Sequence, residues 1–209
     1  MVQTADSDAL PQVVLATRNP HKTVELSRIF EDAGIKVRLI GLDAFPEAPD
    51  VVEDGLTFAD NALKKARAIA EHTGFPAIAD DSGLCVHALN GMPGVFSARW
   101  AGRQHDDGAN LRLLLDQLAD VPDRQRGAQF VCAAAVVVPG STESVVEGTV
   151  AGHVIREPRG HRGFGYDPIF VPDGDTRTTA ELDPAEKDRI SHRGRAVRAL
   201  APIVAKLLG

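Results

Sequence analysis

The sequence has little of several features that mark whole classes of protein. Only two cysteines, Cys85 and Cys132, occur in 209 residues, and both stand in strand-like runs where a buried thiol is commoner than a disulfide or a metal ligand. The longest apolar run, 130–138, is about half of the roughly 20 residues that a membrane helix needs. The seven histidines show no HxH or HExxH spacing, which disfavours zinc. These features favour a cytoplasmic protein without a membrane span.

Positive charge is also scarce. Acidic residues outnumber basic ones by 29 to 23, which gives a net charge of −6. A broad basic surface for nucleic acid is therefore not expected, and any phosphate binding must depend on a local cluster of cations. No GxxxxGK[ST] loop is present. Residues 1–11 are acidic and lack the apolar core of a signal peptide, so we expect a disordered tail followed by one domain over 12–209.

Apolar periodicity and turn residues predict an alternation of strands and helices. The expected elements are a strand at 12–16, a helix at 20–33, a strand at 36–40, a loop at 41–56, a helix at 57–73, two strands around a break at 81–83, a helix at 106–119, strands at 129–138 and 143–155, and a helix from Ser191 to about 208. Early alternation followed by hairpins indicates an α/β fold with a mixed sheet flanked by helices.

The stretch VVLATRNPHKTVEL places cations where a helix begins. Asn19 is expected to be the N-cap and Pro20 the first helical residue. Arg18, His21 and Lys22 then lie at the positive end of the helix dipole, where a cation costs roughly 0.3–1 kcal/mol. A phosphate bound by the free N–H groups would explain these cations. An ordinary Asn-Pro cap in a solvated basic turn is the alternative.

The stretch ADDSG offers two adjacent carboxylates, Asp80 and Asp81, which we expect on a tight turn at the end of a strand. Either one beside a phosphate is a reasonable ligand for Mg²⁺, and Glu53 provides another carboxylate before the next helix. The alternatives are an Asx-turn and a solvated acidic loop. Asn61 and Lys65 share one helix face and could be directed at Asp81, although a polar surface face is the more frequent explanation of such a pair.

The stretch GFGYDP sets Phe164 between two glycines, where its ring could stack on a nucleic base. Asp167 supplies acceptors for base N–H groups, and a packed aromatic plug is the alternative. Further along, Lys187, His192 and Arg193 lie around the start of the last helix, where cations again indicate an anion.

Six stretches together resemble one family. In order along nearly the whole chain they are LATRNPHK, EDGLTFADNALKKA, ADDSGL, PGVFSARWAG, GFGYDPIF and SHRGRA. This series is similar to the inosine triphosphate pyrophosphatase family, which includes the bacterial dITP/XTP pyrophosphatases. The resemblance implies an elongated α/β structure with a cleft between two lobes, usually a homodimer. It also implies Mg²⁺-dependent hydrolysis of deaminated purine nucleoside triphosphates to the monophosphate and pyrophosphate.

The resemblance implies roles for individual residues. Asp81 would accept the proton of the attacking water, and Glu53 and Asp81 would bind Mg²⁺. The residues expected to bind the substrate are Thr17, Arg18, Asn19, Pro20, His21, Lys22, Ser82, Phe164, Gly165, Tyr166, Asp167, Lys187, His192 and Arg193.

Small departures and two other functions stay open. Phe96 and Trp100 stand where the family pattern suggests tyrosine or a similar aromatic residue, and we expect packing rather than chemistry to change. The first alternative function is a nucleotide-binding module without hydrolysis. The second is a phosphatase that releases orthophosphate.

Overall fold

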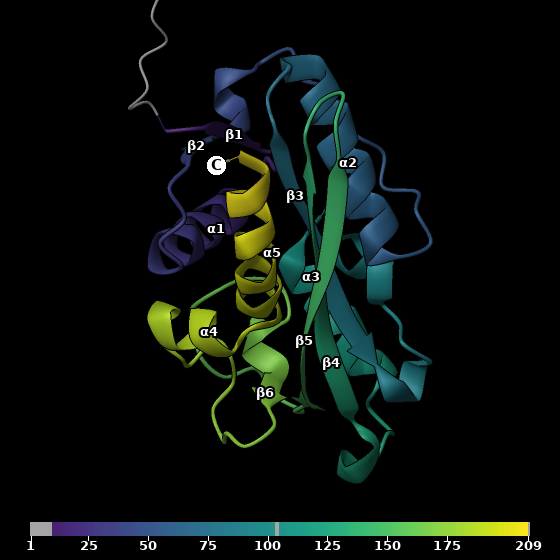
Figure 1. Cartoon of the computed structure of the whole chain (residues 1–209). Coiled ribbons are helices and arrows are strands. Elements are labelled where there is room, and N and C mark those ends of the chain that lie inside the picture. Colours follow the sequence, from purple (N-terminus) through teal and green to yellow (C-terminus); the bar gives the residue numbers. More distant parts are fainter. Residues whose placement is uncertain (1–9, 103–104, 209) are drawn as a thin grey trace, which may run out of the picture.

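A computed structural model describes residues 10–102 and 105–208 (Figure 1). Most of the tail expected over 1–11 therefore lies outside the described residues. The strands are β1 (Gln12–Leu15), β2 (Arg38–Ile40), β3 (Ala77–Val86), β4 (Gly127–Val137), β5 (Glu143–Val154) and β6 (Phe170–Pro172). The helices are α1 (Pro20–Asp32), α2 (Phe58–Thr73), α3 (Asp107–Gln117), α4 (Pro184–Ile190) and α5 (His192–Leu208), with a 3-10 helix η3 at Gly94–Arg99.

One mixed sheet organises the chain. Its strand order is β2-β1-β3-β4-β5-β6. Strands β2, β1 and β3 run parallel, whereas β3 to β6 pair antiparallel. The expected α/β fold, a mixed sheet flanked by helices, is confirmed. Across the described ranges, no helix has both the length and the apolar character needed to span a membrane.

Helices cover both faces of the sheet, as Figure 1 shows. α2 packs on one face, where Ala77 and Ala79 of β3 share a buried cluster with Ala62. α1 and α5 pack on the other, where Ile78 shares a cluster with Leu26. Because successive side chains of a strand point to opposite faces, the odd-numbered residues in the first half of β3 face α2 and the even-numbered ones there face α1 and α5.

A further core fills the other end of the sheet. It joins the distal halves of β3, β4 and β5 to α3 and β6, with Leu84, Leu114 and Phe170 completely buried. The core is thus divided between two ends of one sheet, with β3, β4 and β5 running through both.

The expected break at Asp81–Gly83 is wrong, because β3 is one continuous strand. Its ladder with β4 runs through the polar residues, and Asp81 is paired with Ala133. Neither carboxylate of the ADDSG stretch therefore lies on a turn. On its other edge β3 pairs with β1 only at Ala77 and Ile78. The aspartates follow at once, at the carboxyl end of β1, which is where ligands of α/β sheets bind.

The final segment also differs from expectation, because α4 precedes α5. Asp183 and Glu186 form a capping box around Pro184 and start α4, a sequence signal that the periodicity did not show. Ser191 ends α4, and its Oγ accepts a hydrogen bond from the backbone N–H of Gly194 at 3.0 Å. The expected N-cap role of Ser191 for the last helix is confirmed.

Two other helix starts match their predicted chemistry. Asn19 caps α1 and accepts hydrogen bonds from the backbone N–H groups of His21 and Lys22. Thr57 and Asp60 form the capping box of α2. These caps fix where α1 and α2 begin.

Gly148 of β5 allows α5 to lie close to the sheet. A Cβ at this position would be 2.3 Å from the carbonyl oxygen of His192 and 2.4 Å from the backbone nitrogen of Ala196.

We expect Gly148→Ala to lower the free energy of unfolding by about 1–3 kcal/mol, because the helix must shift. Urea unfolding measures this change. Ala151→Ser, at an exposed position of the same strand, is the control; equal midpoints for both variants would contradict the close approach.

Candidate active site

The two adjacent aspartates serve opposite faces of the sheet. Asp80 points toward α1 and α5, and its side chain is completely buried. Its Oδ2 lies 2.9 Å from Nζ of Lys22 and 3.1 Å from Nε of Arg193. One carboxylate oxygen thus holds two cations that come from helices far apart in the sequence.

Asp81 points toward α2 on the other face. Its Oδ2 accepts a hydrogen bond from Nδ2 of Asn61 at 2.9 Å, and its Oδ1 lies 3.6 Å from Nζ of Lys65. The same Lys65 donates to Oε1 of Glu53 at 2.6 Å. The face that Asn61 and Lys65 share is therefore directed at Asp81 rather than at solvent. The first of the two interpretations of this helix face is confirmed, and the solvated polar surface is wrong.

The two aspartates have opposite pKa shifts. Burial raises the pKa of Asp81 above its usual range, and the neighbouring Glu53 adds to this effect against the charge of Lys65. Burial would also raise the pKa of Asp80, but the charges of Lys22, Arg193 and Lys65 outweigh it and hold that pKa well below its usual range. Asp80 is therefore a permanent counter-ion, whereas Asp81 is the carboxylate that more readily takes up a proton.

Glu25 of α1 extends the charged cluster. It is buried, pairs with Arg193, and accepts a hydrogen bond from Nζ of Lys187 at 2.9 Å. Lys187 also lies 2.7 Å from Oδ2 of Asp167. Burial by itself would raise the pKa of Glu25, but the charges of Arg193 and Lys187 lower it. A continuous row of alternating charges therefore connects the middle of β3 with the GFGYDP loop.

The ring of Phe164 lies over the end of this row. It stacks on His21 at 5.5 Å between ring centroids, with planes 18° apart. Lys187 Nζ lies 5.3 Å and the Arg193 guanidinium carbon 5.5 Å from the ring centroid. A hollow of about 170 Å³ lies beside Phe164 and is also lined by His21, Glu25 and Lys187. The predicted phosphate stretch and the predicted base stretch therefore meet here.

His192 is not a cation. Its ring is buried and stacks on Phe130 at 4.7 Å between centroids. Burial and the charges of Arg193 and Lys187 hold its pKa well below the ordinary value. Of the three residues predicted as cations here, only Arg193 is therefore a charged side chain at the start of α5, since Lys187 belongs to α4.

Several other predicted site residues have contacts of their own. Ser82 accepts a hydrogen bond on Oγ from Arg193 at 2.9 Å, so it joins the site. Thr17 accepts the backbone N–H of Asn19 at 3.2 Å, next to Pro20 at the start of α1. Arg18 instead points at an exposed loop, where its Nε lies 2.9 Å from Asp50.

Sequence reasoning missed Glu25 and Arg99 as members of the site. Arg99 donates to the carbonyl oxygen of Glu53 at 2.8 Å and lies 3.6 Å from its carboxylate. Glu25 stands one turn before Ile29 on the apolar stripe of α1, and a charge in such a stripe was the available signal. Nothing comparable marked Arg99, because only the fold brings η3 beside the loop that carries Glu53.

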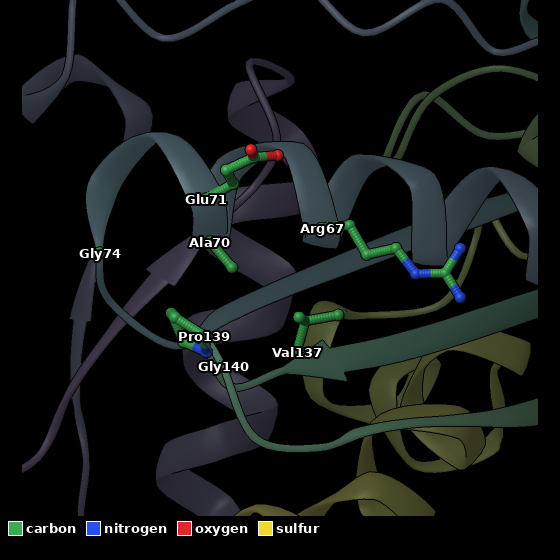
Figure 2. A pocket seen from close by; sticks show the side chains of 7 residues that line it. All are labelled: Arg67, Ala70, Glu71, Gly74, Val137, Pro139 and Gly140. Carbon is green, nitrogen blue, oxygen red and sulfur yellow. The ribbon is translucent and has the colours of Figure 1, made fainter.

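A larger hollow, of about 380 Å³, lies away from these residues, between the end of α2 and the β4–β5 turn (Figure 2). Its lining includes Arg67, Glu71 and Val137. Arg67 forms an exposed ion pair with Glu143. The hollow contains no paired carboxylates and no aromatic ring, so the chemistry of the molecule is concentrated around β3.

In the described part of the chain, no three His, Cys, Asp or Glu side chains are arranged to hold a metal ion. Glu53 and Asp81 nevertheless face the same Lys65, which brings two carboxylates to one place at the edge of α2. Carboxylates are the ligands that Mg²⁺ takes together with phosphate oxygens and water, so the chemistry of these two side chains suits this ion.

The fold and the site together define an α/β protein with carboxylates, cations and an aromatic ring gathered at the carboxyl end of a parallel strand, the place where ligands of such sheets bind. The model of the Ham1 family matches residues 13–203, and the chain belongs to this family. A Streptomyces coelicolor protein named dITP/XTP pyrophosphatase is 60% identical over 200 residues, which cover 96% of this chain and 100% of the relative. A Nocardia farcinica protein of the same name is 57% identical over 199 residues, or 95% and 97% of the two chains.

Solved structures agree with the fold. The Ham1 protein of Staphylococcus aureus has a TM-score of 0.82 at 39% identity, over 94% of this chain and 99% of its own. A HAM1 protein from Coxiella burnetii has a TM-score of 0.84 at 41% identity, over 94% and 100%. The family resemblance inferred from the six sequence stretches is confirmed.

We expect Asp80→Asn to lower the free energy of unfolding by about 2–4 kcal/mol at pH 7, because Lys22 and Arg193 lose a buried counter-ion. The pKa of Asp80 is lower in the folded than in the unfolded chain, so its carboxylate stabilises the fold above about pH 4 and this contribution is lost as the pH falls further. The difference between wild type and variant should therefore narrow below about pH 4.

Denaturant unfolding at several pH values measures this difference. Asp123→Asn removes one partner of an exposed ion pair with Arg156 and is the control, with little expected change. A constant difference at every pH would contradict the assignment of Asp80 as the counter-ion.

Proposed function

We propose that this protein hydrolyses deaminated purine nucleoside triphosphates, ITP, dITP, XTP and dXTP, to the monophosphate and pyrophosphate. Its relatives at 60% and 57% identity over nearly the whole chain carry the name dITP/XTP pyrophosphatase, which supports the activity. Such an enzyme removes these nucleotides before they enter DNA or RNA.

One observation carries the mechanism. Asp81 is a carboxylate of raised pKa, buried beside the cations of the site and oriented by the amide of Asn61. A carboxylate in such a place is a better proton acceptor than one in water, because its pKa lies closer to the operating pH. We infer that Asp81 accepts the proton of the attacking water as the anhydride bond between the α and β phosphates breaks and pyrophosphate leaves.

Glu53 and Asp81 would hold Mg²⁺ together with phosphate oxygens. When bound, this ion would supply charge neutralisation on the triphosphate and on the leaving pyrophosphate. Lys65 lies between the two carboxylates, so its ammonium is placed to bind phosphate on the same side of β3. Lys22 is the corresponding cation on the other side, with its charge held in position by Asp80.

The opposite end of the charged row would bind the base. Phe164 supplies a ring for stacking, and His21 is exposed, so it can yield that ring face to a purine. Hypoxanthine and xanthine carry an oxygen at position 6 where adenine carries an amino group. A backbone or side-chain donor beside the ring would pair with that oxygen and would be left unpaired by adenine, which disfavours ATP.

Other parts of the proposal concern the protein as a whole. Residues 12–209 would act as one two-lobed domain with the site between its lobes. We also propose a cytoplasmic homodimer that acts on small molecules and binds neither nucleic acid nor membranes. The net charge of −6 supports the exclusion of nucleic acid.

The first test is turnover of ITP, XTP, GTP and ATP with Mg²⁺, with pyrophosphate and orthophosphate quantified separately. We expect pyrophosphate from ITP and XTP and little product from ATP or GTP. Asp81→Asn should lower kcat by at least ~10²-fold, because the variant cannot accept the proton. Asp116→Asn, at an exposed position of α3, is the control.

Each other result would point to a different function. Orthophosphate as the product would indicate a phosphatase. Binding of ITP without turnover would indicate a nucleotide-binding module. Near-normal turnover by Asp81→Asn would refute the assignment of the proton acceptor.

Phe164→Ala should raise KM for ITP roughly ten-fold and change kcat less, because stacking on a base contributes about 1–3 kcal/mol. Steady-state kinetics measure both parameters. Phe164→Tyr keeps the ring and should preserve KM. An unchanged KM in the alanine variant would show that the ring serves packing alone.

A further inference from the structure

The loop that carries Phe164 has a backbone that glycine adopts most easily. Gly163 has φ of +74° and Gly165 has φ of +60°. Glycine loses more conformational freedom on ordering than other residues, so the position of the ring depends on contacts that hold the loop. Asp167 provides one such contact within the loop, since its Oδ2 accepts the backbone N–H of Phe164 at 2.9 Å.

Two other contacts tie this loop to the start of α3 and to η3. The backbone N–H of Gly165 donates to Oδ2 of Asp107 at 2.9 Å. The hydroxyl of Tyr166 donates to the carbonyl oxygen of Ser97 at 2.9 Å, with the tyrosine ring buried. Ser97 in turn accepts the backbone N–H of Leu84 on its Oγ at 2.9 Å. The loop is thereby connected to the strand that carries both aspartates.

The direction of the Asp107 side chain is not explained by its own helix. Asp106 is the N-cap of α3, and its Oδ1 accepts the backbone N–H of Ala109 at 2.9 Å. Asp107 occupies the first turn, where a negative charge is favourable whichever way the carboxylate points. The carboxylate is nevertheless directed at Gly165, 58 residues further along the chain.

We propose that Asp107 is a positioning residue for nucleotide binding. Its carboxylate holds the backbone of Gly165 and thereby fixes the ring of Phe164 in the place where a base would stack. Asp107 itself makes no contact with the substrate. The inference rests on the proposed function, because that function gives Phe164 its role.

Asp107→Ala removes the acceptor and should raise KM for ITP roughly 3- to 10-fold with little change in kcat. Binding of the product IMP, measured by calorimetry, should weaken by a similar factor. Inhibition by inorganic tripolyphosphate should not change, because Lys22 and Lys65 lie outside the loop. Asp107→Asn keeps an acceptor oxygen and should restore wild-type values to within about two-fold.

Asp116→Ala removes an exposed aspartate from the same helix and should leave all of these values unchanged. Three results would overturn the proposal. The first is wild-type binding of IMP by Asp107→Ala. The second is equal impairment of the asparagine and alanine variants, which would assign the effect to charge. The third is an equal loss of tripolyphosphate binding, which would indicate a general defect.

Amide hydrogen exchange in the free protein tests the hydrogen bond between Asp107 and Gly165, here called the anchor, without any nucleotide. The Gly165 N–H should exchange faster in Asp107→Ala than in wild type, and at the wild-type rate in Asp107→Asn. If these rates hold but the wild type does not hydrolyse ITP, the proposed function fails and the anchor stands. If exchange in Asp107→Ala is unchanged, the anchor fails even when ITP is hydrolysed.

Discussion

The carboxylate of Asp80 is the contact on which the rest of the site depends. It binds Lys22 of α1 and Arg193 of α5 through one oxygen atom, completely buried between these helices and the sheet. A buried carboxylate is costly unless it is paired, so Asp80 requires its cations, and its single negative charge leaves one of the two positive charges to be balanced elsewhere. Glu25 then takes up the remaining side of Arg193 and passes the same constraint to Lys187. The packing of the helices on the sheet and the placement of the cations therefore depend on the same buried ion pairs.

The pleat of β3 gives the neighbouring residue, Asp81, a different environment from that of Asp80. Because Asp81 follows Asp80 on the opposite face, it is removed from the strong counter-ions and meets Asn61 and Lys65 instead. One aspartate is thereby kept ionised and the other is left with a raised pKa. Adjacent positions of one strand thus place two carboxylates with opposite pKa shifts on opposite faces of the sheet, a separation that a tight turn would not produce.

The elements that surround β3 connect the two ends of the site. From Asp80 the charged row runs through Glu25 and Lys187 toward the loop of Phe164. On the other side, Ser97 links β3 to the same loop through Tyr166. A displacement of α5 or of η3 is therefore expected to affect base binding and phosphate binding together.

By itself, the sequence determined the helix caps, the hairpin of β4 and β5, and the resemblance that identified the family, because these depend on residues close together in the chain. Asn19 and Thr57 are helix caps as expected. Only the tertiary structure decided that Asp80 and Asp81 lie within a strand, since pairing with β4 overrides their preference for turns. It also decided that the cations at helix starts have protein counter-ions such as Glu25, 168 residues from Arg193 in the sequence. Local pattern predicts how each segment folds, but the partner of a buried charge depends on which segments the sheet brings together.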